Sequence, residues 1–223
     1  MYLILKRLFD LCSSLLVLII ILPLMLPIII LLKFTSEGEI LYLQERIGYN
    51  NKKFMIYKFV TMLKNSSKMK GGHITINNDS RVTFIGRFLR KSKINELPQL
   101  INIIKGDMSV VGPRPLMQVS FESYPEKIQK LIYRSKPGLT GLGSIIFRDE
   151  EDLITEEKNK GGDILEFYKK KIYPLKGELE IWYQNNRSLF LDLKLILISF
   201  WVIFYPKSQL IYNIFKNLPK KKF

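Results

Sequence analysis

The chain has 223 residues and a formal charge of +15, and 47% of its residues are hydrophobic. This hydrophobic fraction excludes a disordered basic tail, and the length suits one sizeable domain with a membrane element better than two full domains. The charge indicates an anionic partner, which leaves nucleic acid, a phospholipid surface and a phosphate-bearing substrate as candidates.

An uncharged apolar segment, residues 11–32, lies near the N-terminus. As one helix it would reach roughly 33 Å, enough to cross a bilayer core. Pro23 lies in its middle, and we expect a break there because an interior proline removes a backbone hydrogen bond and clashes with the preceding turn. Both ends are basic, with Lys6 and Arg7 before the segment and Lys33 after it. Because basic residues prefer the cytoplasmic side, the pattern favours a re-entrant segment over a spanning helix or a buried helix of a soluble domain.

The next elements are short. Residues 40–43 and 54–60 are apolar or aromatic runs separated by Gly48 and by polar residues, which predicts a strand pair or a strand leading into a helix. Residues 65–79 are polar and include Gly71-Gly72, which is typical of a surface loop. Residues 82–90 are predicted to be helical.

A second helix is predicted from apolar residues spaced i, i+3, i+4, i+7, namely Leu97, Leu100, Ile101 and Ile104. Glycines and prolines then predict its end and the start of an extended segment: Gly106, Gly112, Pro113 and Pro115. Residues 136–143 form a glycine-punctuated turn region, and residues 121–134 and 165–186 are further helix candidates.

A second apolar stretch, residues 189–205, contains Asp192 and Lys194. These two ionisable groups make it a poor isolated membrane span, so we expect it to lie on the membrane surface or to pack onto the globular part. The closing lysines, residues 220–222, suit anionic phospholipid headgroups or belong to a solvated tail.

Charge is unevenly distributed along the chain. Residues 46–94 hold twelve Lys or Arg and one acid, whereas residues 149–166 hold eight acids and two lysines. This separation suits a basic bowl for a polyphosphate with an acidic region folded back on it. A solvated acidic face opposite a basic face is the alternative.

The segment around Glu96 combines two properties of a phosphate or metal site. Asn95 precedes a helical pattern and is predicted to cap it, and Glu96 would then lie at the positive end of the helix dipole. Backbone donors for phosphate and a carboxylate for a metal ion would occur together there. With one histidine (His73) and one cysteine in the chain, a His/Cys zinc site is disfavoured and magnesium is the expected metal. Taken alone, a capped helix start is an ordinary feature.

Arg114 lies between two prolines, so its guanidinium is presented from a stiff backbone, which suits bidentate phosphate binding. Other basic residues that can add charge, although each taken singly is an ordinary surface cation, are Lys58, Arg87, Arg90 and Arg148.

Seven short motifs follow one another along the chain: Lys6-Arg7-x-Phe9-Asp10, Tyr57-Lys58-Phe59-x-Thr61-Met62, Gly86-Arg87-Phe88-Leu89-Arg90, Glu96-Leu97-Pro98-Gln99-Leu100, Lys105-Gly106-Asp107-Met108-Ser109, Gly112-Pro113-Arg114-Pro115 and Lys136-Pro137-Gly138-Leu139-Thr140-Gly141. In this order they resemble the bacterial sugar transferase family, the monotopic phosphoglycosyl transferases that start glycan assembly. The resemblance covers about residues 4–200. It implies a re-entrant N-terminal helix, an active site at the cytoplasmic face of the bacterial inner membrane, magnesium, a UDP-sugar donor and a polyprenyl phosphate acceptor.

The chain departs from the family pattern at three positions. The resemblance implies an aspartate nucleophile, which forms a phosphosugar-enzyme intermediate, where this chain has Asn95, and an amide is a far poorer nucleophile. Val60 stands where a basic residue is usual. Leu22 stands where the family has a serine before the proline, so no hydroxyl re-satisfies the freed backbone at Pro23.

These observations predict an α+β, predominantly helical monotopic membrane protein. Residues 1–35 would form a re-entrant helix-break-helix, residues 36–206 a small cytoplasmic catalytic domain with interfacial helices, and residues 207–223 a basic tail.

The leading hypothesis is an active transferase that makes a polyprenyl-diphosphate-linked sugar and UMP. Glu96 would bind magnesium or itself attack the donor phosphorus, while Arg114, Arg90 and Lys58 neutralise the diphosphate. Further carboxylates that could assist are Asp149, Glu150 and Glu180. An ordinary acidic loop is the favoured interpretation of Asp149 and Glu150, and Glu180 needs no function as a carboxylate on a helix face.

Two other classes of function are alternatives for this sequence. A catalytically impaired lipid-phosphate-binding or scaffold protein would keep the fold and Arg114 without a nucleophile. A nucleic-acid-binding protein is disfavoured because it leaves the apolar helix unexplained and no nucleic-acid fold signature occurs.

Overall fold

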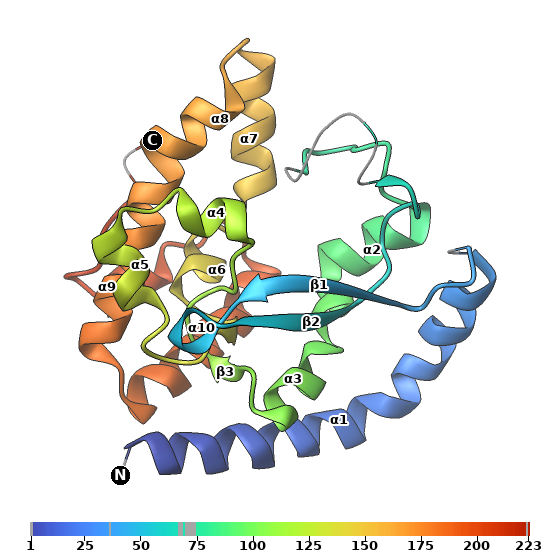
Figure 1. The fold of residues 1–223 in the computed structure, drawn as a ribbon, viewed down its shortest axis with the longest axis horizontal. Coiled ribbons are helices and arrows are strands. Elements are labelled where there is room, and N and C mark those ends of the chain that lie inside the picture. The colour runs from blue at the N-terminus through green and yellow to red at the C-terminus, as the bar shows by residue number, and fades with distance from the viewer. Residues whose placement is uncertain (1, 36, 67–68, 70–74, 222) are drawn as a thin grey trace.

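The computed structural model describes residues 2–35, 37–66, 69, 75–221 and 223 (Figure 1). The described chain is mostly helical and contains two small two-stranded sheets. This confirms the predominantly helical class with a few strands. Gly71-Gly72, His73 and Lys222 lie outside the described residues.

Helix α1 (Tyr2–Thr35) forms the long lower edge of the molecule and curves upward at its C-terminal end (Figure 1). Within the described residues it is the one helix long and apolar enough to cross a membrane. The predicted break into two helices is wrong, because the helix continues through both Pro23 and Pro27. A proline removes one backbone hydrogen bond, and a helix extended by apolar residues on both sides accommodates that loss by bending.

The next two elements form a hairpin that crosses the middle of the molecule (Figure 1). Strands β1 (Leu41–Ile47) and β2 (Lys53–Phe59) are antiparallel, with Leu41 opposite Phe59. Asn50 and Asn51 in the connecting turn have positive φ angles of 53° and 58°, which asparagine tolerates better than most residues. The predicted strand pair is confirmed, and the strand-to-helix alternative is wrong.

Helix α2 (Phe84–Ser92) begins at Thr83, whose hydroxyl accepts a hydrogen bond from the Gly86 N–H. It ends at Lys93 in the left-handed conformation, with φ 63°. The 3-10 turn η3 (Ile94–Glu96) and helix α3 (Gln99–Lys105) follow. Both helices predicted here are confirmed, although their bounds differ.

The predicted capping role of Asn95 is wrong. Asn95 lies inside η3, and neither η3 nor α3 has a side-chain cap. The predicted apolar face also shifts, because Leu100 and Ile103 are buried while Ile101 is exposed. The turn at Lys93 delays the start of the helix to Gln99, and a later start places different residues on the buried side.

Gly106, with φ 93°, ends α3 as predicted, and the chain enters β3 (Ser109–Val111), which pairs in parallel with β4 (Gly138–Thr140). This pairing requires glycine at two positions. A Cβ added at Gly112 would lie 2.3 Å from the Lys136 carbonyl oxygen, and one at Gly138 would lie 2.1 Å from the Gly112 nitrogen. The backbone around Gly112 therefore lies in direct contact with the backbone of residues 136–138.

The remaining elements are helical: α4 (Gln118–Glu122), α5 (Glu126–Ile132), α6 (Leu142–Ile146), α7 (Glu150–Asn159), α8 (Ile164–Phe167), the π-helical turn η4 (Tyr168–Ile172), α9 (Tyr173–Asn186), α10 (Leu189–Phe204) and α11 (Leu210–Ile214). The helix predicted over residues 121–134 is two helices, divided near Pro125, whose backbone is not helical. The helical prediction for residues 165–186 is confirmed. The acidic-loop interpretation of Asp149 and Glu150 is wrong, since Glu150 begins helix α7.

The largest apolar core lies where α6, α9 and α10 meet, and it includes Leu142, Leu179 and Leu195. Burying each such side chain contributes about 1.5–3 kcal/mol. Helix α10 thus packs one face onto the globular part, as predicted, while Leu197 and Phe200 on its other face are exposed.

Within the predicted basic tail, the described residues 207–221 and 223 make contacts with the domain. Ile211 and Leu218 are buried in the largest core, and Phe215 packs edge-on against Trp182. The segment therefore folds back onto the domain. Lys220 is exposed, as an interaction with headgroups would require.

Candidate active site

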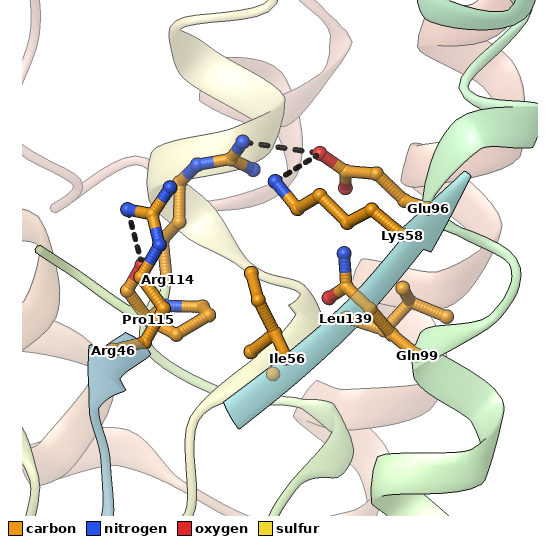
Figure 2. Close-up of a pocket in the computed structure, with 9 residues that line it drawn as sticks. Arg46, Ile56, Lys58, Glu96, Gln99, Arg114, Pro115 and Leu139 are labelled. Atoms are coloured by element: carbon orange, nitrogen blue, oxygen red, sulfur yellow. Dashed lines mark hydrogen bonds and ion pairs between the residues drawn. The ribbon is translucent and has the colours of Figure 1, made fainter. Parts of the chain in front are cut away.

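Glu96 lies between two cations contributed by other parts of the chain (Figure 2). Its Oε1 accepts a hydrogen bond from Arg114 Nη2 at 3.2 Å and lies 3.7 Å from Lys58 Nζ. Strand β2, turn η3 and the segment after β3 thus each supply one side chain. Three groups singled out in the sequence are brought together here.

An asparagine holds the first two of these elements together. Asn102 on α3 accepts a hydrogen bond from the Tyr57 N–H at 3.0 Å and donates to the Met55 carbonyl at 2.8 Å. On the edge of β2 that does not pair with β1, the Asn102 side chain makes the two backbone hydrogen bonds that a neighbouring strand would otherwise make. Lys58 and Glu96 are therefore fixed relative to each other by a fully buried residue that the sequence analysis missed.

Arg114 is positioned by its backbone as well as by its flanking prolines. The Tyr133 hydroxyl donates to the Arg114 carbonyl at 2.8 Å and accepts the Leu116 N–H at 2.8 Å. The guanidinium also donates to Ser144 Oγ at 3.3 Å. The stiff presentation predicted from Pro113 and Pro115 is thus reinforced by Tyr133 and Ser144, which the sequence did not reveal.

The charges of the cluster act strongly on one another. Burial favours the neutral form of Glu96, yet Arg114, Lys58 and Lys93 together hold its pKa well below the usual value. Burial lowers the pKa of Lys58 to about 7, and the Glu96 carboxylate opposes this effect only in part. Glu96 is therefore an anion at neutral pH, whereas Lys58 is close to half protonated.

The pocket around this cluster encloses about 240 Å³, open solvent included (Figure 2). Its charged lining residues are Arg46, Lys58, Arg114 and Glu96, so three cations and one anion give +2 when Lys58 is protonated. Arg46 is held by a hydrogen bond to the Pro115 carbonyl at 3.3 Å. Burial, together with the charge of Arg114, lowers the pKa of Arg46 to about 10. An excess of positive charge around a pocket suits a multiply charged anion such as a diphosphate.

The other predicted cations do not line this pocket. Arg148 donates to the Lys91 carbonyl at 3.3 Å, and Glu96 acts on its charge. Arg90 pairs with Glu151 on α7 at 2.9 Å. Arg87 is exposed on α2 and forms no ion pair with a described residue. The acidic region does fold back onto the basic one, through Arg90.

Asn95 is only 8% exposed, and its Oδ1 has no hydrogen-bond partner among the described residues. A buried carbonyl oxygen without a donor is costly. The side chain next to Glu96 thus has a free acceptor.

The three additional carboxylates differ in their surroundings. Asp149 pairs with Lys221 at 2.7 Å. Glu150 accepts from Lys176 at 2.7 and 2.8 Å and from the Tyr168 hydroxyl. Neither is joined to the cluster at Glu96 by a hydrogen bond or ion pair.

Glu180 is 4% exposed, and its Oε2 has no hydrogen-bond partner within the described chain. Burial raises its pKa to about 7. It lines a second cavity of about 270 Å³, open solvent included, with Arg114, Gly143 and Lys176. Arg114 lines both cavities, so the cavity that contains Glu180 adjoins the candidate site.

The donors at the pocket fit one kind of metal ion. Across the described residues, no group of three His, Cys, Asp or Glu side chains could hold a metal. Magnesium, however, commonly takes one or two carboxylates and completes its coordination with substrate phosphates and water. The ionised Glu96, which lines the pocket, supplies one carboxylate of that donor set.

Fold and pocket together describe a protein with a membrane-length helix and a pocket lined by more cations than anions. A family model described as Bacterial sugar transferase matches residues 1–206. The chain belongs to the bacterial sugar transferase family.

Individual relatives support this assignment. The chain is 32% identical over 197 residues to the UDP-N-acetylgalactosamine-undecaprenyl-phosphate N-acetylgalactosaminephosphotransferase of Aeromonas hydrophila, covering 87% of this chain and 42% of that protein. It is 38% identical over 208 residues to the UDP-glucose:undecaprenyl-phosphate glucose-1-phosphate transferase of Klebsiella pneumoniae, covering 91% and 41%. It is 39% identical over 164 residues to the exopolysaccharide production protein ExoY of Rhizobium meliloti (strain 1021), covering 67% and 72%. The chain thus spans about two fifths of the length of the first two relatives.

Proposed function

We propose that the chain transfers a sugar 1-phosphate from a UDP-sugar to undecaprenyl phosphate, giving undecaprenyl-diphosphate-linked sugar and UMP. The observation that carries this proposal is the pocket in which Glu96 is outnumbered by Arg46, Lys58 and Arg114. Its excess charge matches a diphosphate donor and a phosphate acceptor. The names of the relatives point to the same substrates.

In this proposal Arg114 and Lys58 hold the phosphates that react. An oxygen of the lipid phosphate attacks the sugar-bearing phosphorus of the donor, a new P–O bond forms, and the bond from that phosphorus to the UMP oxygen breaks. The fixed cations neutralise the negative charge that gathers in the transition state without rearranging, which is where such sites gain most of their rate.

Glu96 serves in this proposal as a ligand rather than as the nucleophile. The surrounding cations keep its pKa low, and a carboxylate of low basicity is a weak nucleophile. A magnesium ion held by Glu96 would neutralise the donor diphosphate.

The membrane placement is also a proposal. The buried residues of α1 occur along its whole length, from Lys6 to Leu32, so the helix lies along the domain instead of projecting from it. This supports a re-entrant helix in one leaflet of the bacterial inner membrane, with the pocket at the cytoplasmic face. The exposed apolar faces of α1 and α10 would meet the lipid, and the net charge of +15 suits anionic phospholipid.

A transfer assay tests the proposal. Purified protein in nanodiscs is incubated with undecaprenyl phosphate, magnesium and a panel of radiolabelled UDP-sugars, and the lipid-linked product is extracted. We expect turnover with at least one donor, its loss by roughly 10²–10³-fold in Glu96→Gln, and unchanged turnover in the exposed control Glu45→Gln. No turnover with any donor, together with retained binding of the lipid phosphate, would instead indicate a scaffold protein.

Asn95→Asp is the companion variant. If the native chain transfers the sugar phosphate directly from donor to acceptor, the new carboxylate at position 95 would provide a second route through a covalent phosphosugar-enzyme. That covalent species should then be trappable in the variant and absent from the native chain. A large gain in rate would show that Asn95 impairs the enzyme and would contradict the direct route.

A further inference from the structure

The C-terminal segment, residues 207–223, lies beyond the region matched by the family model. Its fixed points are the buried Ile211 and Leu218, with Phe223 packed edge-on against Phe167. The backbone N–H of Lys221 also donates to the Tyr212 hydroxyl. The end of this segment is therefore held in one place on the domain.

Lys221 contacts both sequence neighbours of Arg148. Its ammonium pairs with Asp149 Oδ1 at 2.7 Å and lies 5.5 Å from the centre of the Phe147 ring. Both partners of the ion pair are largely buried, with side-chain exposures of 18% and 27%. A pair shielded to this degree is stronger than one in open solvent.

Arg148 borders the candidate site. Its guanidinium donates to the Lys91 carbonyl, close to the turn that carries Glu96. Burial lowers the pKa of Arg148 while the Glu96 carboxylate raises it, so the two groups interact. The residue after Asp149 is Glu150, which in turn acts on the charge of Arg114. The turn bound by Lys221 therefore lies within electrostatic reach of both Glu96 and Arg114.

We propose that residues 207–223 form a strap in which Lys221 is a positioning residue that fixes Arg148 for binding a substrate phosphate. The inference rests on the proposed function. Arg148 is the phosphate-binding group, and Lys221 acts only through it.

The experiment measures binding of UDP and of inorganic pyrophosphate to the full chain in nanodiscs. We expect Lys221→Met to weaken both by about fivefold, the effect of partly losing one charge-assisted hydrogen bond. Lys221→Arg should restore binding. Lys216→Met is the matched control, because Lys216 is exposed in the same segment and forms no ion pair with a described residue.

The Arg148→Met background separates positioning from general stability. There, Lys221→Met should cause no further weakening, and in the native background it should raise amide hydrogen exchange in residues 147–152. Unchanged affinity in Lys221→Met, or the same weakening with and without Arg148, overturns the strap. Asp149→Asn removes the same ion pair from the other side and replaces Lys221→Met if that variant does not fold. If the chain binds pyrophosphate but not UDP, the donor class is wrong while the strap remains tested by pyrophosphate.

Discussion

Two carboxylates, the buried Asp192 on α10 and the half-buried Glu96 in the pocket, have opposite surroundings. Asp192 Oδ2 receives Lys6 Nζ at 2.7 Å and the Tyr2 hydroxyl at 3.1 Å, and its Oδ1 receives the Tyr183 hydroxyl at 2.8 Å. One anion faces one cation there, and both oxygens are hydrogen-bonded. Glu96 has longer contacts, of 3.2 and 3.7 Å, and is outnumbered by cations.

The difference indicates that the Asp192 cluster is a structural anchor, whereas the Glu96 cluster is a ligand-binding site. The Asp192 cluster is complete, so it joins the first turns of α1 to α10 and leaves little capacity for a ligand. The Glu96 pocket has surplus positive charge and, next to it, an unpaired oxygen on Asn95. Perturbed, incompletely compensated groups are typical of functional sites, whereas closed networks are typical of structural ones.

The largest effect should come from breaking the anchor. Asp192→Asn leaves Lys6 buried without a counter-charge, which costs about 3–5 kcal/mol. Thermal unfolding in detergent should show a correspondingly lower midpoint. The control is the double variant Lys6→Met/Asp192→Leu, which removes both charges and should recover most of the lost stability. Equal destabilisation of the single and double variants would show that the ion pair is not the cause.

A substitution in the pocket should lower the catalytic activity and leave the thermal stability nearly unchanged. Arg114→Lys keeps the charge but loses the planar fork that reaches Glu96 and Ser144 together. We expect kcat/KM for the donor to fall about 10²-fold, or ~2.7 kcal/mol, with little change in the unfolding midpoint. An unfolding midpoint that falls as far as in Asp192→Asn would mean that the pocket, too, is an anchor.

Local patterns predicted the elements whose cause is local. The proline-containing apolar run, the strand pair and the glycine end of α3 at Gly106 follow from neighbouring residues, and so does the stiff setting of Arg114. The local proline rule predicted a break at Pro23, but α1 is continuous there. The residues on both sides of the proline favour a helix, and their combined preference outweighs the local rule.

Features that depend on distant contacts were missed. Helix α7 is strongly acidic, and a single buried residue, Ile154, anchors it to the core. Its first turn is fixed by Lys176 and Arg90, which are remote in sequence. Arg46 likewise enters the pocket through the register of the hairpin, which composition does not specify.

Glu180 is intermediate between the two clusters, since it is buried without a paired cation. Burial raises its folded pKa from 4.5 to about 7, so its contribution to stability is complete below pH 4.5 and is lost as pH rises through 7. Glu180→Gln should therefore exceed the native chain in unfolding free energy at pH 8, by roughly 3 kcal/mol, and the gain should shrink toward pH 4.5. Unfolding measured across this range checks the sign. A gain independent of pH would place the cause in packing instead.

The smallest expected effect concerns Lys58, and it tests the surplus charge directly. With a pKa of about 7 in the free protein, Lys58 loses its proton as pH rises, so kcat/KM for the donor should fall up to tenfold per pH unit above 7. The donor diphosphate does not titrate in this range, and the lipid acceptor is kept saturating. Lys58→Arg remains charged and should flatten the profile. If the native profile is already flat through pH 7, Lys58 is fully charged and compensated in the way Lys6 is, and the contrast between the two carboxylates would not hold.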